Sequence, residues 1–170
     1  MGEIKSTLDL IMERTKNLSM SPEEKEEMKR QEWLKKARGW IQKFLDDQVD
    51  LPKLKMELVE KDPPDGWKTL LRQELIEGLD PQGDNQKRWH LMNRLLTISL
   101  EPFLNVLSSF NHKVNESRKA QESLFLNELS SQGLTGSAVI PNLDSHPSWK
   151  AFLNQESQSC RDRWRVLRDN

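Results

Sequence analysis

Cysteine, tyrosine and long apolar runs are scarce or absent in this chain of 170 residues. It contains one cysteine, Cys160, and no tyrosine. A single cysteine excludes an intrachain disulfide, so the composition fits a reducing compartment better than a secreted setting. No stretch reaches the roughly 20 apolar residues of a membrane-spanning helix, and charges interrupt the first 18 residues, where a signal peptide has an apolar core. We therefore predict a cytoplasmic protein that makes no use of a membrane.

An excess of charge of one sign is also missing. The chain has 26 basic and 27 acidic residues and a formal net charge of −1. Without a net positive field, nothing in the overall charge favours a nucleic-acid partner. Its three histidines, His90, His112 and His146, lack the second histidine or carboxylate at the spacings of helical zinc and di-iron sites. We predict no metal and no cofactor.

Apolar residues at helical spacing are abundant, and they predict an all-α fold. Ile4, Leu8, Ile11 and Leu18 form one stripe over residues 3–18. We predict that residues 1–20 form an amphipathic helical arm and that residues 21–170 form a single helical-bundle domain. An arm that carries one apolar stripe is suited to contact a second copy of the chain, so a homodimer is expected.

Start and stop signals divide the rest of the chain into helices. Ser21-Pro22 with Glu24 matches a capping box that precedes a helix to about residue 48. Further helices are predicted over residues 51–62 and 67–79, and the last begins at Pro147.

The longest periodic run covers residues 84–130 and contains Pro102. A proline inside a helix removes a hydrogen bond and clashes one turn back, so we predict either a kink or a short break near residues 98–101. The apolar stripe thins over residues 113–121, where the face is either wet or completed by another chain. The expected fold is a bundle of five or six helices with one long, Pro-kinked central helix.

Six tryptophans lie mostly on helical stripes, which favours packing in a core or an interface over a stacking site. Trp89 and Trp149 are expected to be partly exposed, because each lies early in its helix. Trp164 among C-terminal arginines resembles a small nucleic-acid contact, although a solvated helix end is the favoured interpretation. The candidate interaction residues are Ile4, Leu8, Ile11, Trp89, Trp149, Trp164, Arg161 and Arg165.

Two enzymatic interpretations stay open. Cys160 beside Arg161 matches an activated thiol, but no histidine partner is evident, and a buried cysteine that packs as a small apolar residue is favoured. Carboxylates far apart in the sequence, such as Glu74, Glu77, Glu101 and Glu128, form a site only if the fold brings them together.

The first residues carry a resemblance. The segment Gly2 to Leu10, followed by Glu13-Arg14-Thr15, resembles the opening of certain small, uncharacterised bacterial helical proteins. The resemblance implies a bacterial cytoplasmic protein, and such a family carries no established activity to transfer. From the residues themselves we predict a non-enzymatic interaction or scaffolding protein that binds a second copy or another protein. The alternatives are a carboxylate-based helical enzyme and a nucleic-acid accessory factor.

Overall fold

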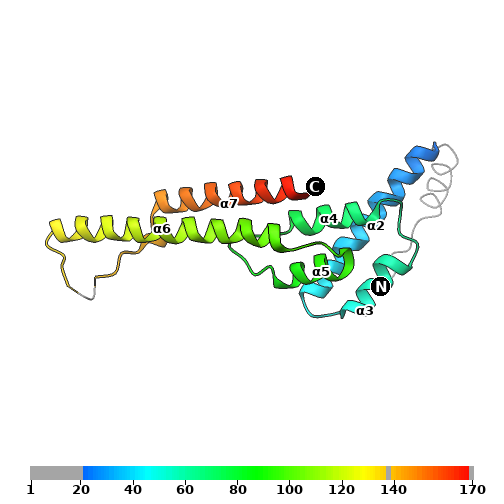
Figure 1. Ribbon diagram of the computed structural model, residues 1–170, viewed down its shortest axis with the longest axis horizontal. Helices are drawn as coiled ribbons and strands as arrows, with labels where there is room; N and C mark the ends of the chain where they lie inside the picture. Colours follow the sequence, from blue (N-terminus) through cyan, green and yellow to red (C-terminus); the bar gives the residue numbers. More distant parts are fainter. Residues whose placement is uncertain (1–20, 137–138, 169–170) are drawn as a thin grey trace, which may run out of the picture. The chain divides into compact units, whose positions relative to one another are not determined.

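The computed structural model describes residues 21–136 and 139–168, and every regular element in these ranges is helical (Figure 1). There are six α-helices, with one π-helical and one 3-10 turn, which confirms the predicted all-α class and helix number. None of the described helices is both long and apolar enough to cross a membrane. The chain divides into two compact units, one ending at Leu71 and the other beginning at Arg72.

The first unit begins with helix α2 (Pro22–Leu45) at the predicted capping box. Ser21 Oγ accepts a hydrogen bond from Glu24 N at 3.2 Å, and Glu24 Oε2 accepts one from Ser21 N at 2.7 Å. Helix α3 (Leu51–Lys55) follows, with the Asp50 side chain as its N-cap, and continues as the π-helical turn η1 (Met56–Glu60). The helix therefore stops before Pro63 and Pro64, as those prolines require.

The core of this unit lies between α2 and the α3–η1 segment. Trp33 is 7% exposed, and its indole N–H donates to Leu58 O at 3.3 Å. The rings of Trp33 and Trp67 lie 6.3 Å apart in a tilted arrangement. The other buried residues of α2, α3 and η1 are Ala37, Ile41, Leu54 and Leu58.

The second unit contains α5 (Gln86–Leu96), α6 (Glu101–Ser131), the 3-10 turn η2 (Leu143–Ser145) and α7 (Pro147–Arg168). Helix α4 (Trp67–Glu77) crosses the boundary between the two units. Of the two outcomes predicted at Pro102, a break occurs, so the continuous kinked helix over residues 84–130 is wrong. Thr97 ends α5 in a left-handed conformation (φ 56°), and Pro102 lies in the first turn of α6, where no backbone donor is needed.

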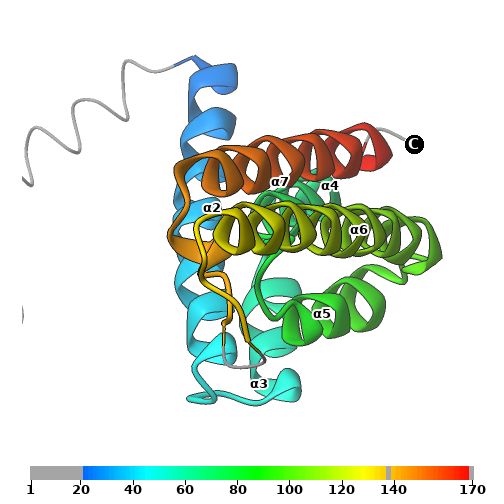
Figure 2. The ribbon, with the colours of Figure 1, turned by 90° about the vertical axis from the view of Figure 1, so that its left-hand side faces the viewer.

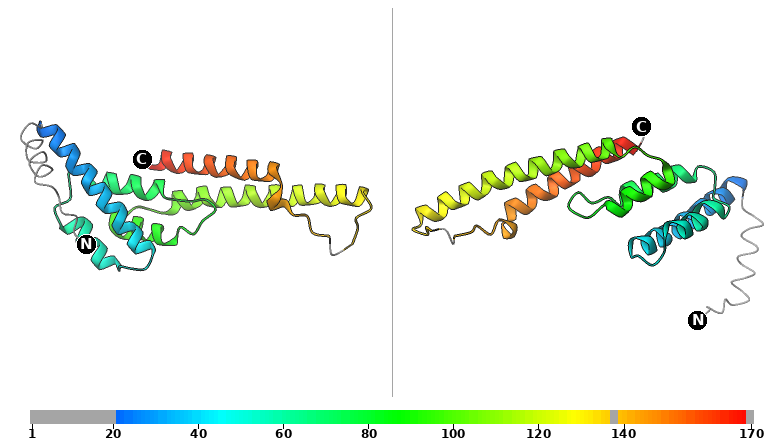
Figure 3. Two further views of the ribbon diagram at one scale, coloured as in Figure 1. Left: turned by 180° about the vertical axis from the view of Figure 1, so that it is seen from behind. Right: turned by 60° about the horizontal axis from the view of Figure 1, so that its bottom comes forward.

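Helices α6 and α7 run antiparallel, side by side (Figures 2 and 3). Trp164 donates to Phe103 O at 3.1 Å near the start of α6. Lys113 Nζ lies 2.6 Å from Glu156 Oε1 farther along. As residue numbers rise along α7, the contacted numbers therefore fall along α6.

Aromatic rings form the centre of the second unit. Trp89 lies 5.9 Å from Trp164 in an edge-on arrangement and 6.0 Å from Phe103. Such pairs add about 0.5–1.5 kcal/mol to the burial of the rings themselves. The predicted arm over residues 1–20 lies outside the described residues, and the assignment of residues 21–170 to one domain stays a prediction.

Candidate interaction surface

The last part of α6 extends beyond the helix that packs on it. The Arg118 guanidinium lies 5.0 Å from the Trp149 ring, near the start of α7. From Arg118, α6 continues to Ser131, about 20 Å at 1.5 Å per residue. We call residues 121–131 the α6 overhang. In Figure 1 it is the yellow end of α6, past the start of α7.

The face that packs inside the unit continues into the overhang without a cover. Phe103, Phe110 and Leu124 lie at multiples of seven residues, so they share one face of the helix. Phe103 is 2% and Phe110 6% exposed, whereas Leu124 is 67% exposed. The same apolar stripe is therefore buried in the first part of α6 and open to solvent in the last.

Other apolar side chains are exposed on the overhang and the segment that follows it. These are Leu126, Leu134 and Ile140, at 41%, 55% and 84% exposure. A hollow of about 270 Å³ lies between the helix and the returning segment, lined by Phe125, Glu128, Leu129, Gln132, Pro141, Asn142 and His146. An apolar floor with a carboxylate at its edge suits an aliphatic side chain from another molecule.

The wall of this hollow is held by polar contacts. His146 lies 4.7 Å from the Phe125 ring, and its Nδ1 is 2.7 Å from Ser148 Oγ, a local hydrogen bond at the start of α7. Arg118 Nη2 donates to Asp144 Oδ1 at 2.7 Å. That hydrogen bond and the charge of the Arg118 guanidinium lower the pKa of the Asp144 carboxyl.

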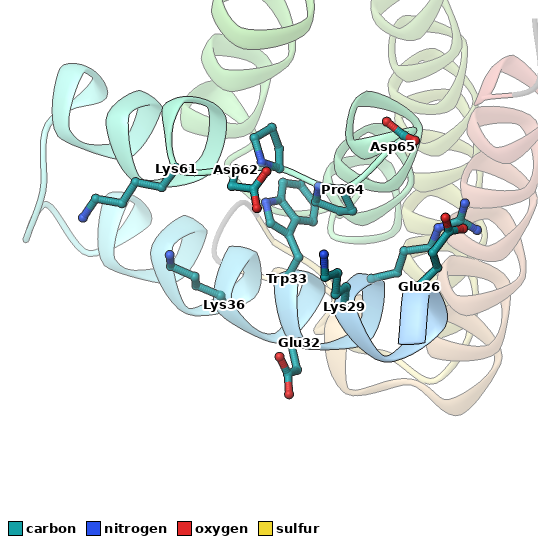
Figure 4. A pocket seen from close by; sticks show the side chains of 11 residues that line it. Glu26, Lys29, Glu32, Trp33, Lys36, Lys61, Asp62, Pro64 and Asp65 are labelled. Carbon is teal, nitrogen blue, oxygen red and sulfur yellow. The ribbon is translucent and has the colours of Figure 1, made fainter. Parts of the chain in front are cut away.

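A second hollow, of about 430 Å³, lies in the first unit (Figure 4). The Trp33 indole points from α2 toward the segment with Asp62 and Pro64. Four cations and four acids line it: Lys29, Arg30, Lys36, Lys61, Glu26, Glu32, Asp62 and Asp65. This balance of charges selects no class of ligand.

The three tryptophans predicted as interaction residues are buried. Trp89 is 8%, Trp149 0% and Trp164 1% exposed. The expectation that Trp89 and Trp149 are partly exposed was wrong, because neighbouring elements cover these early turns. Trp89 packs on Phe103 and Trp164, and the Trp149 ring stacks on Phe152 at 5.3 Å with Arg118 over it. Ile4, Leu8 and Ile11 lie outside the described residues.

The two arginines of α7 that were predicted as interaction residues form ion pairs within the second unit. Arg161 Nη2 lies 3.1 Å from Asp80 Oδ1, and Arg165 Nη2 lies 2.8 Å from Glu77 Oε2. The hydrogen bond from Arg165, followed by the charges of Arg165 and Arg168, lowers the pKa of Glu77 although partial burial opposes the shift. Because Trp164 is buried and these arginines pair with acids, the cluster lacks the exposed stacking surface that a nucleic-acid contact needs.

The four carboxylates considered for catalysis do not all converge on one site. Glu101 and Glu128 lie near opposite ends of α6, about 40 Å apart along the axis. Glu77 pairs with Arg165. A different set of carboxylates would be needed for an enzyme of this kind.

Cys160 is buried and packs as a small apolar residue, which was the favoured interpretation. Its side chain is 3% exposed, and burial raises the pKa of the thiol to about 11, against the opposing charges of Arg163 and Arg161. An activated cysteine has a lowered pKa, so the raised pKa of Cys160 argues against a nucleophilic role. Within the described residues, no group of three or more His, Cys, Asp and Glu is arranged to hold a metal ion.

The overhang was missed in the sequence, although a signal for it exists. Leu124-Phe125-Leu126 places three bulky apolar residues in succession. Successive residues turn about 100° around a helix, so three cannot all face one neighbour. Their presence at a helix end indicates an exposed apolar surface.

Comparison of the chain with models of protein families, with curated proteins and with solved structures gives no match. The function is therefore inferred from the molecule's own surfaces. The overhang carries exposed apolar side chains and adjoins a hollow.

Proposed function

We propose that this chain is a non-enzymatic, cytoplasmic interaction protein whose docking surface for another protein chain is the α6 overhang. The observation that carries the proposal is the 67% exposure of Leu124, on the face where Phe103 and Phe110 are buried. A helix laid on the overhang would continue the line of α7 along α6. It would cover the apolar face in the manner of helix-in-groove recognition.

The exposed apolar side chains of the overhang support the proposal. Single exposed leucines are ordinary, but contiguous apolar patches mark interaction sites on many proteins. Leu124 lies on the face of Phe103 and Phe110, whereas Leu126, two residues later, points to nearly the opposite side of the helix. The hollow beside Phe125 has room for an anchoring side chain. Burying a leucine-sized anchor contributes about 1.5–3 kcal/mol.

The cytoplasmic and non-enzymatic parts of the proposal rest on other residues. A single, buried thiol is compatible with a reducing compartment and unsuited to nucleophilic chemistry. The carboxylates that were candidates for an acid–base site do not all come together, because Glu101 and Glu128 lie near opposite ends of α6 and Glu77 pairs with Arg165.

The test is affinity capture with matched baits in cells that express the chain. The baits are the wild type, a Leu124→Ser/Leu126→Ser variant and a Leu104→Ser control. Leu104 is also exposed on α6, at 44%, but lies outside the overhang. We expect wild type and control to retain the same protein partner, a second copy included, and the overhang variant to lose it.

The proposal fails if no protein, including an untagged copy of the chain, is retained by the wild type. It also fails if the overhang variant retains every partner of the wild type. Circular dichroism of the three baits must show equal helix content, so that loss of a partner is not loss of the fold.

A further inference from the structure

We infer that the hollow beside Phe125 receives an arginine side chain of another protein, and that an aliphatic residue next to this arginine packs on Leu124. The inference rests on the proposed function, because it states the chemistry of the partner that binds the α6 overhang. The hollow and the charge of Glu128 carry it.

The size of the hollow fits one side chain. Its volume is about 270 Å³, below the roughly 300–1,000 Å³ of pockets that hold whole small molecules. Phe125, Leu129 and Pro141 supply apolar surface, and the ring of His146 lies 4.7 Å from that of Phe125. The hollow is therefore suited to a single, partly apolar side chain that a larger partner presents.

The polar groups of the hollow favour a side chain that donates hydrogen bonds. Glu128 carries a carboxylate, which only accepts, and Gln132 and Asn142 each carry an amide oxygen that accepts. A wholly aliphatic side chain would remove water from the carboxylate without replacing its hydrogen bonds, which opposes binding. The charge of Glu128 favours a cation as the donor.

The Glu128 carboxylate has no ion-pair partner among the residues that the structure describes. No lysine or arginine occurs over residues 120–149. Lys119, nine residues before Glu128, points to the opposite side of the helix, about 180° away. Arg118 donates to Asp144. A cation from a partner would therefore displace no existing pair of Glu128.

Arginine meets these requirements better than lysine. Its guanidinium is planar, so it stacks on rings such as Phe125 and His146, and it donates two hydrogen bonds to one carboxylate at the same time. Its aliphatic stem packs on apolar surface while the charged end stays near solvent. In the hollow, the stem would contact Leu129 and Pro141, and the guanidinium would pair with Glu128.

Leu124 adds a second requirement for the partner. Around the helix, Glu128 lies about 40° from Leu124, and Phe125 lies about 100° from it in the same direction. The carboxylate thus lies between the hollow and Leu124, which is 67% exposed. An aliphatic residue beside the arginine would cover Leu124. On a partner helix, the two residues would be three or four positions apart.

Selection of helical peptides displayed on phage, with the full chain as bait, tests the inference without a known partner. We expect the selected peptides to share an arginine three or four positions from an aliphatic residue. Against a Glu128→Gln bait this arginine should lose its enrichment. The matched control is Glu116→Gln, which should leave the enrichment unchanged, because Glu116 is an exposed glutamate of α6 outside the overhang.

Fluorescence anisotropy with the most enriched peptide measures the coupling between the two charges. Glutamine in place of its arginine, and Glu128→Gln in the chain, should each weaken binding about fivefold. The two changes together should weaken it no further than either alone. A lysine peptide should bind less tightly than the arginine peptide. Circular dichroism must show equal helix content for all baits.

The inference is overturned if no peptide is enriched, if the peptides show no preference for arginine over lysine, or if that preference survives Glu128→Gln. Dimerisation of the full chain that Glu128→Gln abolishes in sedimentation equilibrium would also overturn it, because the arginine would then belong to a second copy. Peptides without an arginine preference that lose binding to the Leu124→Ser/Leu126→Ser variant would leave the proposed function standing. Peptides that bind this variant as tightly as the wild type would count against both.

Discussion

The two parts of helix α6 have the same kind of apolar stripe and opposite surroundings. In the first part, Phe103 and Phe110 are buried, and Trp164 of α7 donates its indole N–H to Phe103 O. In the overhang, Leu124 and Leu126 lie in solvent. The difference arises because α7 begins at Pro147, opposite Arg118, so that no part of α7 lies beside the rest of α6.

This difference separates residues that stabilise the fold from residues that are available for binding. Burial in the first part supplies free energy of folding, whereas the overhang contributes little to folding and offers its apolar area to a partner. Substitutions in the two parts should therefore affect different measurements. The predictions below test that separation, beginning with the largest expected effect.

Trp164→Ala should have the largest effect on stability. The side chain is 1% exposed and packs edge-on against Trp89, so its removal should lower the free energy of unfolding by about 3–5 kcal/mol. Urea denaturation followed by circular dichroism measures the change. Trp164→Phe keeps a ring but loses the hydrogen bond to Phe103 and should fall between wild type and alanine. A loss below about 1 kcal/mol for alanine would contradict the packing of α7 on α6.

Cys160 should react slowly in the folded protein. Its pKa is raised from 9.0 to about 11 by burial, and each unit lowers the thiolate fraction about tenfold below both values. Alkylation by iodoacetamide at pH 8 should therefore be about 100-fold slower in the native chain than in denaturant. Equal rates would show that α7 does not protect the thiol.

Glu77→Gln should lower the melting temperature at pH 7 and have less effect in acid. The folded-state pKa of Glu77 lies below its ordinary value of 4.5 because of Arg165. Its contribution to stability is thus present above pH 4.5 and disappears as the pH falls through the lowered pKa. Thermal melts of both proteins at pH 7 and pH 3 measure the gap. In an Arg165→Gln background the gap at pH 7 should shrink, and an unchanged gap would exclude the pair as its cause.

Leu124→Ser should have the smallest effect on folding. The side chain is already 67% exposed, so the free energy of unfolding should stay within about 0.5 kcal/mol of the wild type. Leu104→Ser is the control on the first part of α6, where the side chain is 44% exposed. Urea denaturation of both variants at one protein concentration measures the changes, and a loss as large as that of Trp164→Ala would place Leu124 in the core.

Local signals in the sequence predicted much of the fold. Ser21, Pro22 and Glu24 specified the start of α2 because capping depends on residues within one turn. Pro102 specified an interruption, but not whether a kink or a break follows. That outcome depends on Thr97, which adopts a left-handed conformation, uncommon for a β-branched residue, and ends α5.

Features that depend on contacts between distant segments were beyond local reasoning. The burial of Trp149 depends on Arg118, and the pairing of Arg165 depends on Glu77 in another helix. The overhang depends on the register between α6 and α7, which the spacing within either helix does not contain. The run Leu124-Phe125-Leu126 gave the one local indication of it.

The most direct test of the docking surface is photo-crosslinking from defined positions. A photo-reactive amino acid is placed at position 124 or, as the control, at position 104 in the full chain, and cells that express each variant are illuminated. We expect a discrete protein adduct from position 124, either with a second copy or with one partner, and none from position 104. The absence of an adduct from position 124, or equal adducts from both positions, would contradict the overhang as the docking surface.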